Sequence, residues 1–214
     1  MILREFDLDI PNIGDKNKRV KFRDEIRCIA SMYERYFSKF KTKNCWKILI
    51  ECVDMVTNEK VRDLLGAYTI QVKFNIDEYF KLSNTQKKKI VLECLKEGID
   101  KVCDEMKWEK SPFEEAYNKI IENNYENNWT WKKPVRNPTK EYKAEVFCEH
   151  HVDVFNISII IKNYKGEELI RKMVKDERPN EFSYVWHFGE LKWISDNEVV
   201  LINQDGNERW SVKI

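Results

Sequence analysis

Glycine and proline are scarce in this sequence: 214 residues include six glycines and five prolines. The glycines are scattered, so neither GxxxxGKS/T nor GxGxxG, the loops that hold nucleotide phosphates, occurs. The GxSxG motif of serine hydrolases is missing as well, and the chain has only three histidines. These absences exclude the common motifs of nucleotide binding and of nucleophilic hydrolysis, and nothing in the chain indicates a cofactor.

Long apolar runs are also missing. The longest, residues 154–161, is broken by Asn156 and Ser158 and is far shorter than the ~20 residues of a membrane-spanning helix. The first ten residues alternate charged with apolar side chains and contain no continuous apolar segment of the kind that a secretory signal needs. We therefore expect a cytoplasmic protein without a membrane association.

Neither sign of charge is in excess. Lysine and arginine number 38 and aspartate and glutamate 37, which gives a formal net charge of +1. A nucleic-acid-binding protein usually carries a basic excess, because phosphate contacts supply most of its affinity. The charge balance therefore argues against nucleic acid as a partner, whereas 42% hydrophobic residues are enough for a globular core.

The six cysteines form no CxxC pair, so no zinc site is indicated by their spacing. Four of them, Cys28, Cys52, Cys94 and Cys103, fall within apolar patterns, where a thiol behaves as a small hydrophobic side chain. We expect all six to be free thiols in a reducing compartment.

Strand and helix periods alternate in the first half of the chain. Residues at period two predict strands, and residues at three- and four-residue steps predict helices. Ser83 precedes Gln86 by three positions, and Ser111 precedes Glu114 by three, so each serine is expected to open a helix with a capping box. The expected elements are strands near residues 5–10, 46–52 and 68–74 and helices over 18–39, from 83 and from 111.

The period changes after Asn123. Residues 129–140 are rich in asparagine, lysine and proline and predict a linker. Short strand patterns separated by turn signals follow. They cover residues 142–148, 154–162, 169–175, 182–186, 191–194, 199–202 and 210–214.

These patterns predict an α+β fold. Residues 1–128 would form an antiparallel sheet covered by helices, in the order β-α-β-β-α-α. Residues 129–140 would link it to a C-terminal antiparallel β-meander or sandwich-like module, residues 141–214, packed on the first part.

Two groups of side chains are candidates for a metal site. Glu149, His150, His151 and Asp153 are the densest set of potential ligands, but no further histidine has ligand spacing to them, and we interpret them as a polar bend between strands. The second group is an acidic row on one face of a strand, formed by Glu5, Asp7 and Asp9. Carboxylates in this pattern hold Mg²⁺ in nucleases, usually with a lysine and another acid nearby, and Lys47 and Glu51 of the next strand could supply those two groups here.

The acidic row of Glu5, Asp7 and Asp9 has two other interpretations. A sheet covered on one side exposes an alternating polar face in any case, and the same face could dock a basic partner. Trp129 and Trp131 are further candidates for partner binding, because aromatic residues are enriched at interaction hot spots. We favour an internal role for the two tryptophans, in which they hold the second half onto the first.

We favour a non-catalytic cytosolic protein that binds another protein, of the immunity, inhibitor or accessory type found in bacterial toxin, defence or phage systems. The composition, rich in asparagine, lysine and isoleucine, suits an AT-rich bacterial or phage genome. The alternative is a divalent-metal-dependent hydrolase or nuclease that uses the acidic strand face. The sequence assigns no catalytic, cofactor or metal residue and leaves the oligomeric state open.

Overall fold

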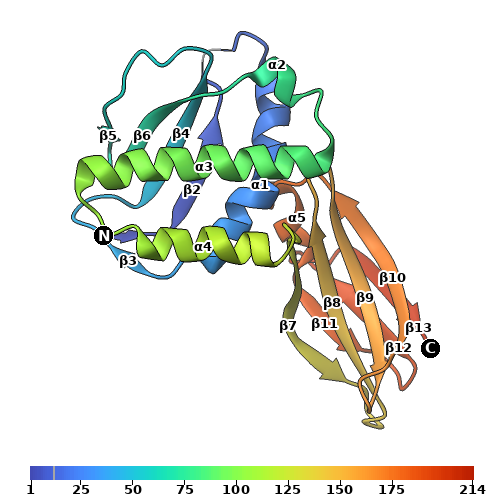
Figure 1. Cartoon of the computed structure of the whole chain (residues 1–214). Helices are drawn as coiled ribbons and strands as arrows, with labels where there is room; N and C mark the ends of the chain where they lie inside the picture. The colour runs from blue at the N-terminus through green and yellow to red at the C-terminus, as the bar shows by residue number, and fades with distance from the viewer. Residues whose placement is uncertain (12) are drawn as a thin grey trace. The chain divides into compact units, whose positions relative to one another are not determined.

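The computed structural model describes residues 1–11 and 13–214, which form two units, residues 1–126 and residues 127–214 (Figure 1). The fold is α+β, as the sequence predicts, with helices in the first unit and antiparallel sheets in the second. The elements of the first unit are β1 (Ile2–Leu3), β2 (Glu5–Asp9), α1 (Lys16–Tyr36), β3 (Phe40–Lys41), β4 (Lys47–Val53), β5 (Arg62–Leu64), β6 (Ala67–Lys73), α2 (Ile76–Tyr79), α3 (Asn84–Met106) and α4 (Ser111–Glu122).

The main sheet of the first unit has the strand order β2-β4-β6-β5, and two of its three pairings are parallel. The prediction of an antiparallel N-terminal sheet was therefore wrong for β2, β4 and β6. Helix α1 acts as a crossover that returns the chain to the start of β4, which is what a parallel pairing requires. Between β4 and β6 the chain runs back along β5, which pairs antiparallel with β6. Strand β6 therefore lies between β4 and β5 and runs parallel to β4.

The helices pack against one face of this sheet. Helix α1 contacts β2, and α3, which crosses in front of the strands in Figure 1, contacts β6 and β4. Alternate residues of the strands meet apolar faces of the helices, as the period-two and helical patterns predict. Fully buried members of this core include Phe6, Leu8, Phe22, Ile26, Ile29, Ile48, Ile50, Ile70, Leu95 and Ile99.

The two predicted capping boxes have different outcomes. Ser83 accepts from the backbone N–H of Gln86, and the Gln86 side chain accepts from the N–H of Ser83 at 3.0 Å, so the box that opens α3 is confirmed. The box at Ser111 was wrong, because Lys110 is the cap residue of α4 and makes no side-chain cap bond. The hydroxyl of Ser111 donates to Glu109 at 2.8 Å instead.

The second unit contains two antiparallel sheets, with strand orders β10-β9-β8-β7 and β11-β12-β13, so the predicted meander and sandwich-like module is confirmed. Their inward faces share one core, which includes Val146, Phe155, Ile157, Ile159 and Leu201. The elements are β7 (Asn128–Arg136), β8 (Tyr142–His150), β9 (Phe155–Asn163), β10 (Glu168–Glu177), α5 (Glu181–Tyr184), a 3-10 turn (Val185–His187), β11 (Glu190–Trp193), β12 (Glu198–Ile202) and β13 (Arg209–Lys213).

Two segments of this unit differ from the sequence prediction. Most of the expected linker, residues 129–140, forms the edge strand β7, where Pro134 is tolerated because an edge strand has one unpaired side. The expected strand 182–186 is helical, because the Asn180 side chain accepts from the N–H of Phe182 at 3.0 Å and caps a helical turn.

Candidate functional site

The acidic row lies on β2, an edge strand, and all three of its carboxylates are paired with cations, Glu5 with the neighbouring Arg4 at 3.6 Å. Arg19 of α1 binds Asp9 through two nitrogens, with Nε 2.9 Å from Oδ1. Lys47 of β4 donates to Asp7 at 2.9 Å, and an Arg27 nitrogen lies 3.8 Å from the same carboxylate. Burial alone would raise the pKa of Asp9, but the hydrogen bond and the charge of Arg19 outweigh it and lower that pKa below its usual value.

Side chains of α1 also reach the backbone of this edge strand. The Phe6 N–H donates to Glu34 at 3.0 Å, and Arg27 donates to the Phe6 carbonyl at 3.3 Å. Arg27 and Glu34 are themselves paired at 3.1 Å. Helix α1 therefore covers backbone groups that another strand would otherwise pair with, one of the means by which proteins prevent edge-to-edge association.

No metal site emerges from either candidate group. In residues 1–11 and 13–214, no three His, Cys, Asp or Glu side chains are arranged to hold a metal ion. His150 is buried, with Nε2 3.1 Å from the Pro179 carbonyl and its ring edge-on to Phe155. Glu51, the predicted assistant of the acidic row, is bound by Arg62 of β5 at 2.5 Å.

Trp129 and Trp131 point into the core of the second unit. Trp129 packs beside Phe155, with ring centroids 5.6 Å apart, and Trp131 stacks on Phe188 at 5.2 Å. Both side chains are partly buried against the sandwich core. They thus have a packing role within their own unit.

An exposed group that the sequence prediction missed lies at the amino-terminal ends of the parallel strands. We call it the apolar patch, and its strongest member is Leu65, which is 98% exposed. Three others are between 47% and 61% exposed, and the half-buried indole of Trp46 completes the group. The members are Met1, Ile2, Trp46, Leu64 and Leu65.

The turn between β5 and β6 holds Leu65 in solvent. Leu65 and Gly66 both have positive φ values, 54° and 87°, and Asp63 accepts from the Gly66 N–H at 2.7 Å. A Cβ at Gly66 would lie 2.7 Å from Trp46 Cδ1, so only glycine lets the turn sit so close to the indole. Trp46 Nε1 in turn donates to the Leu65 carbonyl at 3.1 Å.

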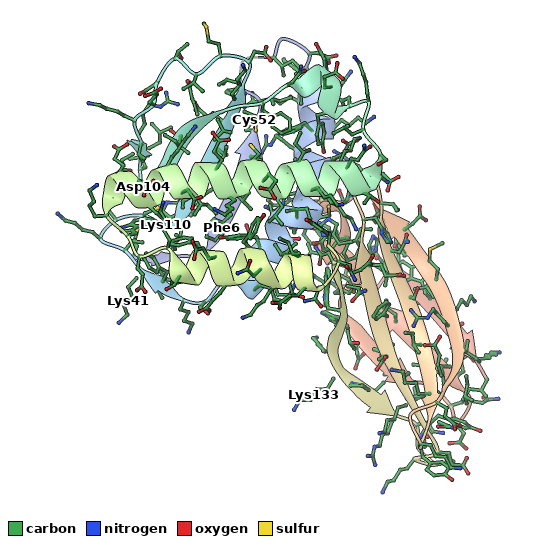
Figure 2. All side chains as sticks on the ribbon, viewed as in Figure 1. Phe6, Lys41, Cys52, Asp104, Lys110 and Lys133 are labelled. Carbon is green, nitrogen blue, oxygen red and sulfur yellow. The ribbon has the colours of Figure 1, made fainter. Side chains whose placement is uncertain are left out.

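Basic side chains border the apolar patch. Trp46, Met1 and Ile2 line a shallow cavity of about 510 Å³ together with Arg4, whose side chain is 71% exposed. Lys41 of β3 and the neighbouring Lys43 are also exposed, and Figure 2 shows the Lys41 side chain extending away from the ribbon. The patch thus combines apolar tips with two basic neighbours, Lys41, which pairs with Ile2 across β1 and β3, and Arg4, which also pairs with Glu5 at 3.6 Å. A signal was available in the sequence, since Leu64-Leu65 precedes a glycine between two strand patterns, where turn residues are normally polar.

A second cavity, of about 500 Å³, lies at the carboxyl ends of the parallel strands, the usual place for ligands in open α/β sheets. Its lining includes Ile13, Cys52, Met55 and the ion pair of Lys18 with Asp77. The first turn of α1 borders it, but the N–H groups of Asn17 and Lys18 already donate to the Asp15 carboxylate at 2.9 and 3.1 Å. This helix end is therefore capped from within and does not offer those amides to an anion.

No family model, no curated protein and no solved structure matches this chain. Across the described part of the chain, none of the helices combines the length and apolar character that crossing a membrane requires.

Proposed function

We propose that this protein is a non-catalytic binding protein that docks another protein through the apolar patch. The observation that carries the proposal is Leu65, an aliphatic side chain 98% exposed on an ordered turn beside further exposed apolar side chains. A group of exposed apolar side chains of this kind is typical of interaction sites. An inhibitor, immunity or accessory protein, which acts by occupying a partner, needs such a surface and no catalytic group.

The partner's chemistry follows from the two basic neighbours of the patch. Arg4 lines the cavity of the patch and Lys41 lies opposite Ile2, so the complementary surface is an apolar pocket with an acidic border. The acidic row of β2 is a poorer docking face, because the charges of Asp7 and Asp9 are already compensated by Lys47 and Arg19. The expected partner is therefore acidic at the contact, rather than basic as the strand pattern alone indicated.

The loss of binding affinity can be worked out for a substitution of Leu65. Burial of an exposed leucine side chain contributes about 1.5–3 kcal/mol, and each 1.4 kcal/mol is a factor of ten in affinity. Leu65→Asp removes that gain and places a carboxylate where an acidic border is expected. We therefore expect at least a tenfold weaker complex.

The experiment begins with capture of a partner on the tagged full chain from its native cells and identification of that partner by mass spectrometry. The purified pair is then titrated with wild type, Leu65→Asp and the matched control Met55→Asp, whose residue is 73% exposed but lies at the other ends of the strands. Loss of affinity confined to Leu65→Asp, with an association rate that falls as salt is added, supports the proposal. Equal affinities for all three proteins contradict it.

Two other occupants of the patch would also contradict the proposal. If the patch joins two copies of the chain, the mass from light scattering will rise with concentration in wild type and not in Leu65→Asp. If the patch binds anionic lipid, wild type will sediment with phosphatidylserine vesicles and Leu65→Asp will not.

A further inference from the structure

Two thiols lie in contact in the core of the first unit. Cys52 of β4 and Cys94 of α3 are 42 positions apart in the sequence, and their Sγ atoms are 3.7 Å apart. Each residue is 4% exposed. A separation of 3.7 Å is a van der Waals contact between sulfurs, and a disulfide needs the two atoms to approach to about 2.05 Å.

The contact is a consequence of how closely α3 lies on β4. Gly98 lies one helical turn after Cys94, and Ile50 lies two residues before Cys52 on the same face of the strand. A Cβ at Gly98 would lie 2.4 Å from Ile50 Cγ1, so the helix approaches the strand at a distance that only glycine permits. The thiols are thereby held together by the close packing of helix on strand next to them.

Each residue of the pair lines a surface cavity. Cys52, near the carboxyl end of β4 in Figure 2, lines the 500 Å³ cavity that also contains Met55. Cys94 lines a separate cavity of about 490 Å³ together with Asp100 and Tyr117. The pair therefore separates two surface cavities.

We propose that Cys52 and Cys94 form an oxidation site, at which a hydroperoxide converts the two thiols into a disulfide that links β4 to α3. One thiolate attacks a peroxide oxygen, the O–O bond breaks, and water or an alcohol leaves, so that a sulfenic acid forms on sulfur. The second thiol attacks that sulfur, the S–O bond breaks, and water leaves as the S–S bond forms. Two thiols are oxidised and one hydroperoxide is reduced.

The second step is the one that the structure favours. Burial raises the pKa of Cys52 well above its usual value, so thiolate is scarce and the first step is slower than at an exposed cysteine. Once a sulfenic acid has formed, however, the neighbouring thiol is already in contact with it. Intramolecular capture of this kind has a large kinetic advantage over reaction with a second peroxide molecule. The product is therefore a disulfide rather than a sulfinic acid.

The test uses the folded full chain, treated with excess hydrogen peroxide, quenched with catalase and denatured without reductant. Wild type should fall from six titratable thiols to four, because the disulfide consumes two. Proteolysis should yield a Cys52–Cys94 cross-linked peptide that dithiothreitol separates.

Cys45→Ser is the matched control, since Cys45 is also buried in the first unit and its sulfur contacts the Lys47 carbonyl at 3.2 Å. This variant should still lose two thiols, whereas Cys52→Ser should form no disulfide. An unchanged thiol count in wild type, a cross-link at other cysteines, or oxygen addition at Cys52 or Cys94 in place of the cross-link would overturn the proposal. Because the cross-link is mapped in wild type, the result does not depend on whether Cys52→Ser folds.

Discussion

Gly98 is the position at which helix α3 comes closest to the sheet, and Gly98→Ala tests that packing directly. An added Cβ would lie 2.4 Å from Ile50 Cγ1 and 2.6 Å from Ile50 Cδ1. Ile50 cannot turn away easily, because it is fully buried and its β-branched side chain has few allowed rotamers. The helix or the strand must therefore shift.

Two effects of opposite sign decide how much Gly98→Ala changes the free energy of unfolding. Alanine is favoured over glycine inside a helix by about 1 kcal/mol. Overpacking of a tight core typically costs about 1–3 kcal/mol, and the contact at 2.4 Å belongs near the upper end of that range. We expect the free energy of unfolding to fall by about 1–2 kcal/mol.

The assay is urea unfolding followed by circular dichroism at the helix band, which reports on the first unit because its helices are the long ones. Gly14→Ala is the control, since among the described residues beyond its chain neighbours no atom lies within 4 Å of its added Cβ, and it should be neutral or slightly stabilising. In an Ile50→Ala background the colliding atoms are absent, so Gly98→Ala should then stabilise the protein. A Gly98→Ala variant as stable as wild type in the native background would refute the packing argument.

Three further predictions concern a cap, a buried ion pair and a carboxylate. Ser83→Ala should lower the unfolding free energy by about 1 kcal/mol, whereas Ser111→Ala should leave the melting temperature unchanged, because only Ser83 caps its helix. Lys87→Met should lower the unfolding free energy in urea by about 3 kcal/mol, because the buried Glu25 loses its cation at 2.8 Å and keeps only the exposed Lys21 at 3.8 Å. Adding Glu25→Gln should recover part of the loss, and no recovery would contradict the pairing. Because the folded protein lowers the pKa of Asp9, this carboxylate stabilises the fold above the unfolded pKa of 3.8, and the stabilisation is lost as the pH falls through the folded pKa. In Asp9→Asn, the unfolding free energy should therefore differ less between about pH 7 and pH 3 than it does in wild type.

The first unit shows what periodicity can and cannot predict. The patterns at residues 46–52 and 68–74 located β4 and β6, because each strand buries alternate residues under the helices. Whether β4 and β6 run parallel depends on β5, which returns the chain between them. The three residues of β5 are all exposed, so its sequence shows no alternation of buried and exposed side chains. Without that strand, β4 and β6 looked like neighbours in an antiparallel pair.

The second unit shows how local composition misleads. Phe182 to Trp186 consists mainly of residues with high strand propensity, yet Asn180 caps it as a helical turn and Tyr184 stacks on Phe155 at 3.6 Å. The polar composition of the expected linker outweighed the period-two spacing of Trp129 and Trp131, which was the strand signal. In both places specific contacts, the Asn180 cap and the pairing of β7 with β8, outweigh the average preference of the segment.

The acidic row shows why the candidate site was harder to predict than the fold. Alternation places Asp7 and Asp9 on one face of a strand, but it does not reveal whether that strand is an edge or what faces it. The decisive residues, Arg19 and Arg27, lie on a helix, ten and twenty residues further along the chain than the carboxylates they meet. Arginines at 19, 23 and 27 do share a stripe at four-residue spacing, so an acidic strand next to a helix with a basic stripe is a pattern that predicts mutual neutralisation. Because these partners compensate one another, binding has to be sought at side chains that the fold leaves unpaired, and Leu65 is the clearest of them.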